Sequence, residues 1–225
     1  MIVGAGPTGL TAALELSRLG VPLRLVDKRE APATTSRAIG VQARTLELLD
    51  QRGLADELVR LGNPGRFGSV YGGGKRVFHL DFAHVESRYP YILFVSQAET
   101  ERVLRDACAC HGIAPEWGTA IVGIQQDAHA HDDAPVHAFL ERPGGALERV
   151  AAPWIIAAEG AHSLVRTTLD LPSKGIPARR TTRWATSRST GRLPTRTSTS
   201  SRPSTASWAC SLWAATTSAS SPRTR

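Results

Sequence analysis

The residues whose types and spacing could do chemistry begin with a glycine turn close to the N-terminus. Gly4, Gly6 and Gly9 form the pattern Gly-x-Gly-x-x-Gly directly after the apolar pair Ile2-Val3. In such a turn the first glycine allows a tight bend, the second lets the backbone approach a pyrophosphate, and the third lets a helix pack closely on a sheet. The N–H groups that open the following helix can then bind phosphate.

An acidic residue at the appropriate distance completes a dinucleotide-binding pattern. The sequence predicts a helix over residues 10–19 and a second strand over residues 21–26, with Asp27 at the tip of that strand. A carboxylate in this place accepts hydrogen bonds from the hydroxyls of an adenosine ribose. We therefore predict a Rossmann-like α/β domain for FAD or NAD(P), with an ordinary βαβ unit that binds no nucleotide as the alternative.

Two arginines follow within residues 36–47, where a glycine turn leads into a helix that ends near residue 51. They are Arg37 and Arg44, seven positions apart. An arginine just inside the start of a helix can reach a pyrophosphate bound at a neighbouring helix N-terminus. A solvated arginine on a helix face explains the same spacing.

Three motifs in order resemble those of the FAD-dependent aromatic hydroxylases. They are the turn at residues 4–9, the segment 36–47 and the later run Glu-Gly-Ala-His-Ser-Leu-Val-Arg at 159–166. This family consists of single-component flavoprotein monooxygenases and includes the 4-hydroxybenzoate, phenol and polyketide hydroxylases. The resemblance implies FAD as cofactor, NAD(P)H as reductant and a small aromatic or polyketide substrate. It implies no catalytic acid or base among the side chains, because the flavin does the oxygen chemistry.

The resemblance also assigns roles to single residues. Arg44 stands where the family has an arginine on the pyrophosphate, and Gln97 stands where it has a glutamine on the flavin side. Glu159 and Gly160 take the place of an Asp-Gly motif whose acid binds the ribitol, and Asp27 replaces the more usual glutamate at the ribose. The full set of expected cofactor-binding residues is Gly4, Gly6, Pro7, Thr8, Gly9, Asp27, Lys28, Arg37, Arg44, Gln97, Glu159 and Gly160.

The charge of the chain is concentrated in its last part. The net charge is +7 over 225 residues, yet residues 176–225 hold nine arginines and no acidic residue. This stretch is rich in Ser and Thr and has almost no large apolar residues, so we expect a disordered tail. Its runs of Thr, Ser and Arg are typical of a GC-rich gene read in the wrong frame, so we interpret it as frameshifted. A natural disordered tail that binds nucleic acid is the alternative.

The remaining features set the domain organisation. We expect an FAD-binding domain over residues 1–175, in which residues 62–95 contribute to a partial, β-rich substrate domain. After the corresponding segment, the family has a large substrate sheet and a Gly-Asp motif whose aspartate contacts the ribitol. This sequence shows neither feature, so we expect weak FAD affinity and little hydroxylation. A reductase that inserts no oxygen stays open as a further alternative.

Other classes of protein are not indicated. Three cysteines make no disulfide framework, and no apolar run is long enough for a membrane span, so we expect a cytoplasmic protein without nucleic-acid or membrane partners. A metal site at His129, His131 and Asp133, or at Cys108, Cys110 and His111, is less well supported than a solvated turn and a packed helix end. The oligomeric state is not indicated.

Overall fold

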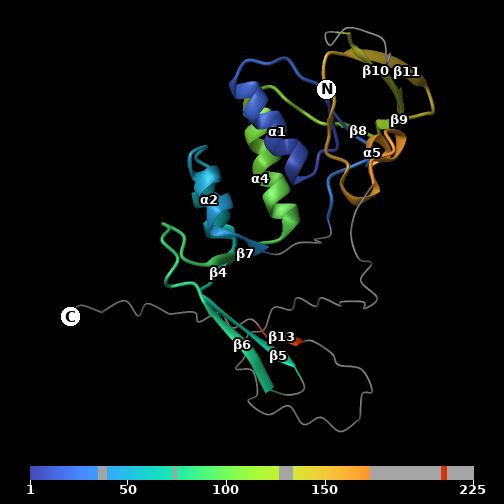
Figure 1. Ribbon diagram of the computed structural model, residues 1–225. Helices are drawn as coiled ribbons and strands as arrows, with labels where there is room; N and C mark the ends of the chain where they lie inside the picture. Colours follow the sequence, from blue (N-terminus) through green and yellow to red (C-terminus); the bar gives the residue numbers. More distant parts are fainter. Residues whose placement is uncertain (35–39, 73–74, 127–133, 173–208, 212–225) are drawn as a thin grey trace.

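The computed structural model describes residues 1–34, 40–72, 75–126, 134–172 and 209–211 (Figure 1). At its centre lies a parallel sheet of four strands in the order β12-β1-β2-β8. The strands are short, with β1 at Ile2–Val3, β2 at Leu25–Asp27, β8 at Glu116–Trp117 and β12 at Ile156–Ala157. Every pair in this sheet is parallel, as the predicted Rossmann-like order of strand, helix and strand requires.

The two faces of this sheet are buried in two different cores. Because successive side chains of a strand point to opposite faces, neighbours in β1 and β2 separate. Ile2 and Leu25 enter the larger core, while Val3 and Val26 enter the smaller one. All four are buried, so the sheet is an inner layer between two others.

Helices cover the first face. They are α1 at Pro7–Arg18, α2 at Ala43–Asp50, α3 at Ala55–Leu61 and α4 at Gln97–Cys110. Leu10 and Leu14 of α1, four residues apart on one face, pack in the same core as Leu46 of α2 and Leu104 of α4. In Figure 1, α1, α2 and α4 run side by side with their N-terminal ends pointing the same way.

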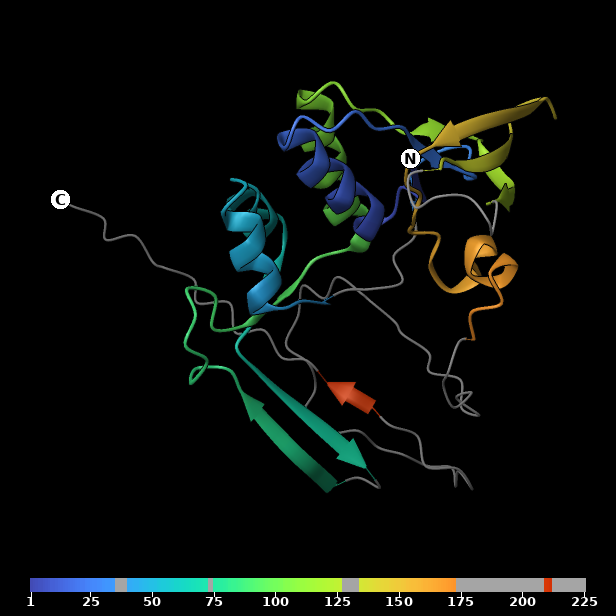
Figure 2. The same cartoon turned by 45° about the horizontal axis from the view of Figure 1, so that its top comes forward.

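A second, antiparallel sheet covers the other face, as Figure 2 shows from above. Its order is β11-β10-β9, with β9 at Ala120–Gln125, β10 at Val136–Glu141 and β11 at Leu147–Ala152. The short helix α5 at Leu164–Thr168 packs beside it through Val165. The strands β10 and β11 pair antiparallel on either side of the turn at residues 143–145.

A hairpin projects from the domain (Figure 1). It consists of β5 at Phe67–Gly72 and β6 at Lys75–Asp81, which pair antiparallel. A small sheet of β3 at Gly40–Val41, β7 at Ile92–Phe94 and β4 at Asn63–Gly65 joins the hairpin to the helices. That residues 62–95 belong to a substrate domain stays a prediction.

The last part of the chain contributes one described element. The strand β13 at Ala209–Ser211 pairs antiparallel with β5, which differs from the expectation of a wholly disordered tail. The other residues from 173 onward lie outside the described residues. No described helix is long and apolar enough to cross a membrane.

Candidate functional site

The glycine turn joins β1 to α1, and two of its glycines are required by close packing. Gly4 has a φ of +101°, and a Cβ there would overlap the carbonyl oxygen of Ala158 at the end of β12. A Cβ on Gly9 would overlap the carbonyl oxygen of Gly4. The turn, the helix and the neighbouring strand can therefore lie this close only with glycine at both positions.

Gly6 is unlike the other two glycines. It is the N-cap of α1 in an extended conformation, with Pro7 as the first helical residue. No atom of the described chain lies within 4 Å of a Cβ built on it. The turn therefore presents open backbone at Gly6, where a ligand can approach, and next to it lies the exposed Thr8.

The helix that follows Gly6 has no side-chain cap. Helices α2 and α3 likewise have no side-chain cap, whereas Ser96 caps α4 by accepting a hydrogen bond from the N–H of Glu99 and Ser163 caps α5 by accepting from the N–H of Arg166. The first N–H groups of a helix need acceptors and carry the positive end of its dipole. An anion such as a pyrophosphate fits this place.

Asp27 lies at the tip of β2 and is 6% exposed. One carboxylate oxygen, Oδ2, accepts from the N–H of Ala5 in the glycine turn at 2.6 Å, and Oδ1 accepts from the N–H of Arg29 at 2.8 Å. Burial opposes ionisation, but the hydrogen bonds from the Arg29 side chain and from these two N–H groups hold the pKa of Asp27 below its ordinary value. Asp27 is thus a carboxylate beside the turn, as predicted.

Gln97 is the first residue of α4, directly after the Ser96 cap. Its side-chain amide donates to Glu101 at 2.8 Å. Glu101 is 2% exposed and pairs with Arg29 at 3.3 Å. The structure therefore joins the predicted Gln97 to the predicted Asp27 through two residues, Glu101 and Arg29, that sequence reasoning missed.

These two residues did leave a signal in the sequence. Glu101 falls on the buried face of α4 in line with Leu104 and Cys108, where a charge requires a partner. Arg29 stands two positions after Asp27 and so returns to the same side of an extended chain. Its guanidinium also lies over the ring of Trp117, 5.5 Å from the centroid.

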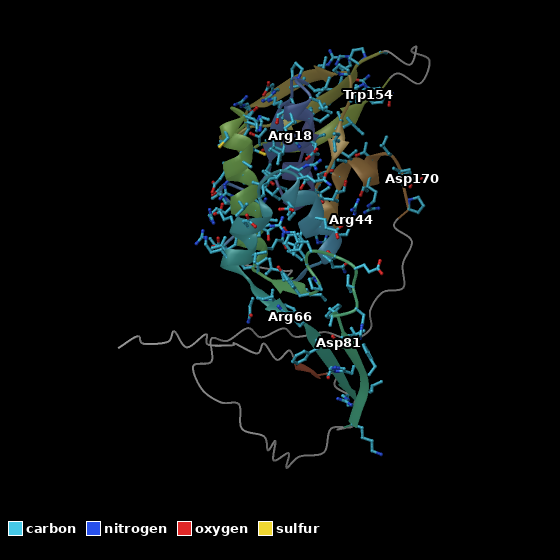
Figure 3. The ribbon with its side chains drawn as sticks, turned by 90° about the vertical axis from the view of Figure 1, so that its left-hand side faces the viewer. Arg18, Arg44, Arg66, Asp81, Trp154 and Asp170 are labelled. Carbon is cyan, nitrogen blue, oxygen red and sulfur yellow. The ribbon has the colours of Figure 1, made fainter. Side chains whose placement is uncertain are left out.

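Arg44 lies in the first turn of α2, and 73% of its side chain is exposed. Figure 3 shows it between Arg18 and Arg66, away from the C-terminal end of α1. It donates to Glu47 at 2.9 Å, and Glu47 also accepts from Ser87 at 2.7 Å. No described contact joins Arg44 to the glycine turn, so its role on a pyrophosphate stays a prediction.

For two further predicted residues, Lys28 and Arg37, a contact with the cofactor stays a prediction. Lys28 follows Asp27 and is exposed to solvent. Arg37 lies outside the described residues, as do His129, His131 and Asp133 of the candidate metal cluster. Within the described ranges, no group of three potential ligands could hold a metal ion.

Glu159 reaches the glycine turn through its backbone. Its N atom lies 3.0 Å from a Cβ built on Gly4. Its carboxylate points to α5, where it accepts from Ser163 Oγ at 2.7 Å and from the N–H groups of Leu164 and Val165 at 3.1 and 3.2 Å. Glu159 thus caps α5 here, and a contact between this acid and the ribitol stays a prediction. Gly160 next to it has a φ of +79°.

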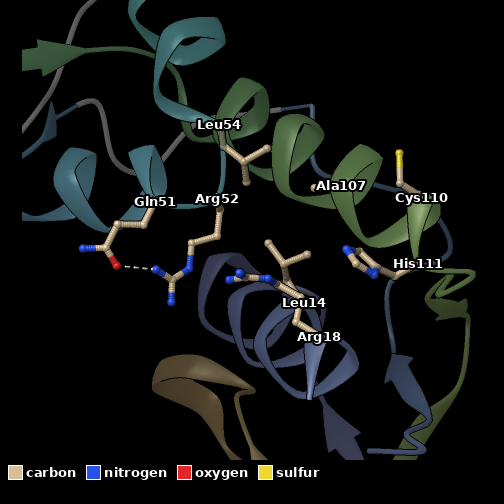
Figure 4. Close-up of a pocket in the computed structure, with 8 residues that line it drawn as sticks. All are labelled: Leu14, Arg18, Gln51, Arg52, Leu54, Ala107, Cys110 and His111. Carbon is tan, nitrogen blue, oxygen red and sulfur yellow. Dashed lines mark hydrogen bonds between the residues drawn. The ribbon is translucent and has the colours of Figure 1, made fainter. Parts of the chain in front are cut away.

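A cavity of about 300 Å³ lies at the other end of the helices (Figure 4). It is lined from α1, α2 and α4 near their C-terminal ends, including Arg18, Arg52 and His111. Cys108 nearby is buried, which raises the pKa of its thiol to about 11, so this thiol is not a ready nucleophile. The cavity is distant from the turn and is not the candidate site.

The part of the chain that carries the candidate site also matches known proteins. Residues 1–197 match the family model described as "FAD binding domain". The chain belongs to this family. The match extends past residue 175, where the composition of the chain changes. The family is that of the FAD-dependent aromatic and polyketide hydroxylases, as the three motifs predicted.

The proteins that this chain resembles include a monooxygenase and a hydroxylase. The chain is 40% identical over 177 residues to 6-methylpretetramide 4-monooxygenase of Streptomyces rimosus, covering 76% of this chain and 30% of that protein. Anhydrotetracycline hydroxylase OxyS of Streptomyces rimosus matches with a TM-score of 0.65 and 33% identity, over 75% of this chain and 33% of its own.

A third similar protein has been solved with ligands. Aklavinone-11 hydroxylase, in a ternary complex with FAD and aklavinone, matches with a TM-score of 0.63 and 30% identity, over 75% of this chain and 34% of its own. The chain therefore spans about a third of the length of these relatives.

Proposed function

We propose that this chain binds FAD at the Gly4–Gly9 turn and forms the cofactor-binding part of an NAD(P)H-dependent monooxygenase. The observation that supports this most is the start of α1, which has no side-chain cap and begins at the open backbone of Gly6. A pyrophosphate supplies the acceptors that these N–H groups need. Membership of the FAD-binding family favours FAD over NAD at the same turn.

The other residues of the site bind and orient the cofactor in this proposal. Asp27 holds the adenosine ribose, Arg44 neutralises the pyrophosphate, and Gln97 contacts the flavin side. Glu159 acts indirectly, because its carboxylate caps α5. The backbone of Glu159 also lies against Gly4 of the glycine turn. When bound, FAD supplies the redox and oxygen chemistry.

The substrate class comes from the relatives. Those named above are monooxygenases and hydroxylases, one of them solved with aklavinone, which favours oxygen insertion into an aromatic or polyketide substrate over a reductase. We place the protein in the cytoplasm, because Cys108 and Cys110 are free thiols.

The test is titration of the purified chain with FAD, followed by flavin fluorescence. We expect saturable binding that Gly6→Ala weakens by about tenfold or more, because a methyl group would enter the space for the pyrophosphate. Gly6 has an extended backbone and open surroundings, so this variant should keep the melting temperature of the parent chain.

Gly123→Ala is the matched control. Gly123 lies in β9, and its Cβ would make only ordinary contact with Phe139, at 3.5 Å. This variant should bind FAD as the parent does. Absence of FAD binding by the parent chain, or equal binding by Gly6→Ala, would overturn the proposal.

A further inference from the structure

The guanidinium of Arg29 lies against the acid that is expected to hold the ribose. Its Nε donates to Asp27 Oδ1 at 3.1 Å and its Nη2 to Oδ2 at 3.0 Å. Nη2 also donates to the carbonyl oxygen of Ala5, inside the glycine turn, at 3.0 Å. Arg29 thus joins the two features that define the dinucleotide site.

These contacts use the full accepting capacity of Asp27. Each carboxylate oxygen accepts one backbone N–H, from Ala5 or from Arg29, in addition to one side-chain N–H of Arg29. A carboxylate offers about four acceptor sites in total. A ribose hydroxyl can therefore donate to Asp27 only after the Arg29 side chain has left.

Arg29 also has partners that do not depend on Asp27. Its Nη1 donates to Glu101 at 3.3 Å, and its guanidinium lies over the ring of Trp117. The Arg29 side chain is 32% exposed, whereas that of Glu101 is 2% exposed. A guanidinium that leaves Asp27 therefore keeps a buried counter-charge and an aromatic face beside it.

We propose that Arg29 blocks the ribose-binding positions of Asp27 and that an adenine dinucleotide must displace it in order to bind. Arg29 then lowers the affinity of this chain for ligands that contain adenosine. The inference rests on the proposed FAD function, since it takes Asp27 as the ribose ligand. It makes Arg29 a determinant of affinity that acts through Asp27.

The experiment removes Arg29 without leaving a buried charge unpaired. Arg29→Leu alone would strand Glu101, so the test compares Glu101→Gln with the double variant Glu101→Gln/Arg29→Leu. Both are titrated with FAD by flavin fluorescence and with ADP and FMN by calorimetry. ADP contains the adenosine ribose and the pyrophosphate, whereas FMN lacks the adenosine.

We expect the double variant to bind FAD and ADP about fivefold or more tightly than Glu101→Gln does, because two charge-assisted hydrogen bonds no longer have to be broken. FMN binding should not differ between the two variants. Arg29→Lys, which keeps the charge but cannot span Asp27, Ala5 and Glu101 together, should bind ADP more tightly than the parent chain.

Equal or weaker ADP binding by the double variant overturns the inference, and weaker binding assigns Arg29 to the ribose contact itself. The proposed function fails by a different result. In that case the parent chain and both variants bind ADP but leave flavin fluorescence unchanged. A change in FMN affinity equal to that for ADP also contradicts the inference, because it indicates a general effect on folding. Thermal melting of each variant accompanies the titrations.

Discussion

At the scale of single residues, the site is dominated by side chains that already have partners. Asp27 is held by Ala5 and Arg29, and Arg44 is held by Glu47. A charged ligand must therefore exchange these contacts for its own, and the affinity reports the difference between the two. Binding at such a site can be strengthened by removing a competing partner.

Arg44 and Glu47 allow this to be tested on the pyrophosphate side. Glu47→Gln should tighten FAD binding by roughly two- to fivefold, the range of an exposed ion pair, because Arg44 no longer has a charged partner on its own helix. Arg44→Gln should weaken binding. Flavin fluorescence titration at low salt measures both, since salt screens exposed pairs.

Ser87→Ala is the control for this prediction. Ser87 donates to the other oxygen of Glu47, so its removal changes a hydrogen bond of Glu47 and leaves the charge in place. We expect no change in FAD affinity. Tightening equal to that of Glu47→Gln would show that the charge of Glu47 does not compete for Arg44.

At the scale of elements, the site depends on how helices begin. The first turn of α1 is left open, whereas α5 is capped twice, by Ser163 and by Glu159. Side chains of the same chain thus satisfy the first N–H groups of α5 but give those of α1 no cap. Val165 of α5 is buried in the smaller core, so the cap also fixes one side of the central sheet.

The cap of α5 predicts a loss of stability when Glu159 is truncated. Glu159→Ala should lower the free energy of unfolding by about 1 kcal/mol, as should Ser163→Ala, because each loses an acceptor for helix N–H groups. The two side chains are hydrogen-bonded to each other, so their effects should not add. Urea unfolding of the two single variants and the double variant measures this coupling.

A different outcome would favour the contact between Glu159 and the ribitol that the resemblance implies. If Glu159→Ala kept the unfolding midpoint and only weakened FAD binding, its carboxylate would serve the ribitol and not the helix. Additive losses would contradict a shared cap.

At the scale of the whole molecule, local patterns predicted more than distant contacts did. The turn at Gly4–Gly9 and the helix that follows it are predicted from spacings of a few residues, and both are confirmed. Arg29 also pairs with Glu101, which is 72 residues away, and no local period indicates that pairing. The resemblance assigned Glu159 to the ribitol, but it did not predict that the carboxylate points to α5.

Long-range ion pairs likewise join the two sheets. Arg24, next to β2, is hydrogen-bonded to Glu116 of β8 and to Glu148 of β11. Arg142 adds a second guanidinium to Glu148 at 2.9 Å. The group therefore ties the central parallel sheet to the antiparallel sheet that covers it, through residues far apart in sequence.

This group predicts that stability decreases in acid. The hydrogen bonds from Arg24 and then from Arg142 lower the pKa of Glu148 from 4.5 to about 2. The hydrogen bond from Arg24 is also the main cause that lowers the pKa of Glu116. A carboxyl whose pKa is lower in the folded chain stabilises it fully above the unfolded pKa and loses this effect as the pH falls through the folded pKa. The contribution of Glu148 should therefore be complete at pH 7 and decline from about 4.5 towards 2.

Glu148→Gln should accordingly be less stable than the parent chain at neutral pH, and the difference between them should shrink as the pH falls below about 4.5. Denaturant midpoints measured between neutral pH and about pH 3 give the two curves. Glu86→Gln, at an exposed acid in the connection from β6 to β7, should leave the curve of the parent chain unchanged. A gap that stays constant across this range would show that Glu148 contributes by its shape and not by its charge. In that case the two sheets would be held together by the apolar core around Val26 and Leu140 alone.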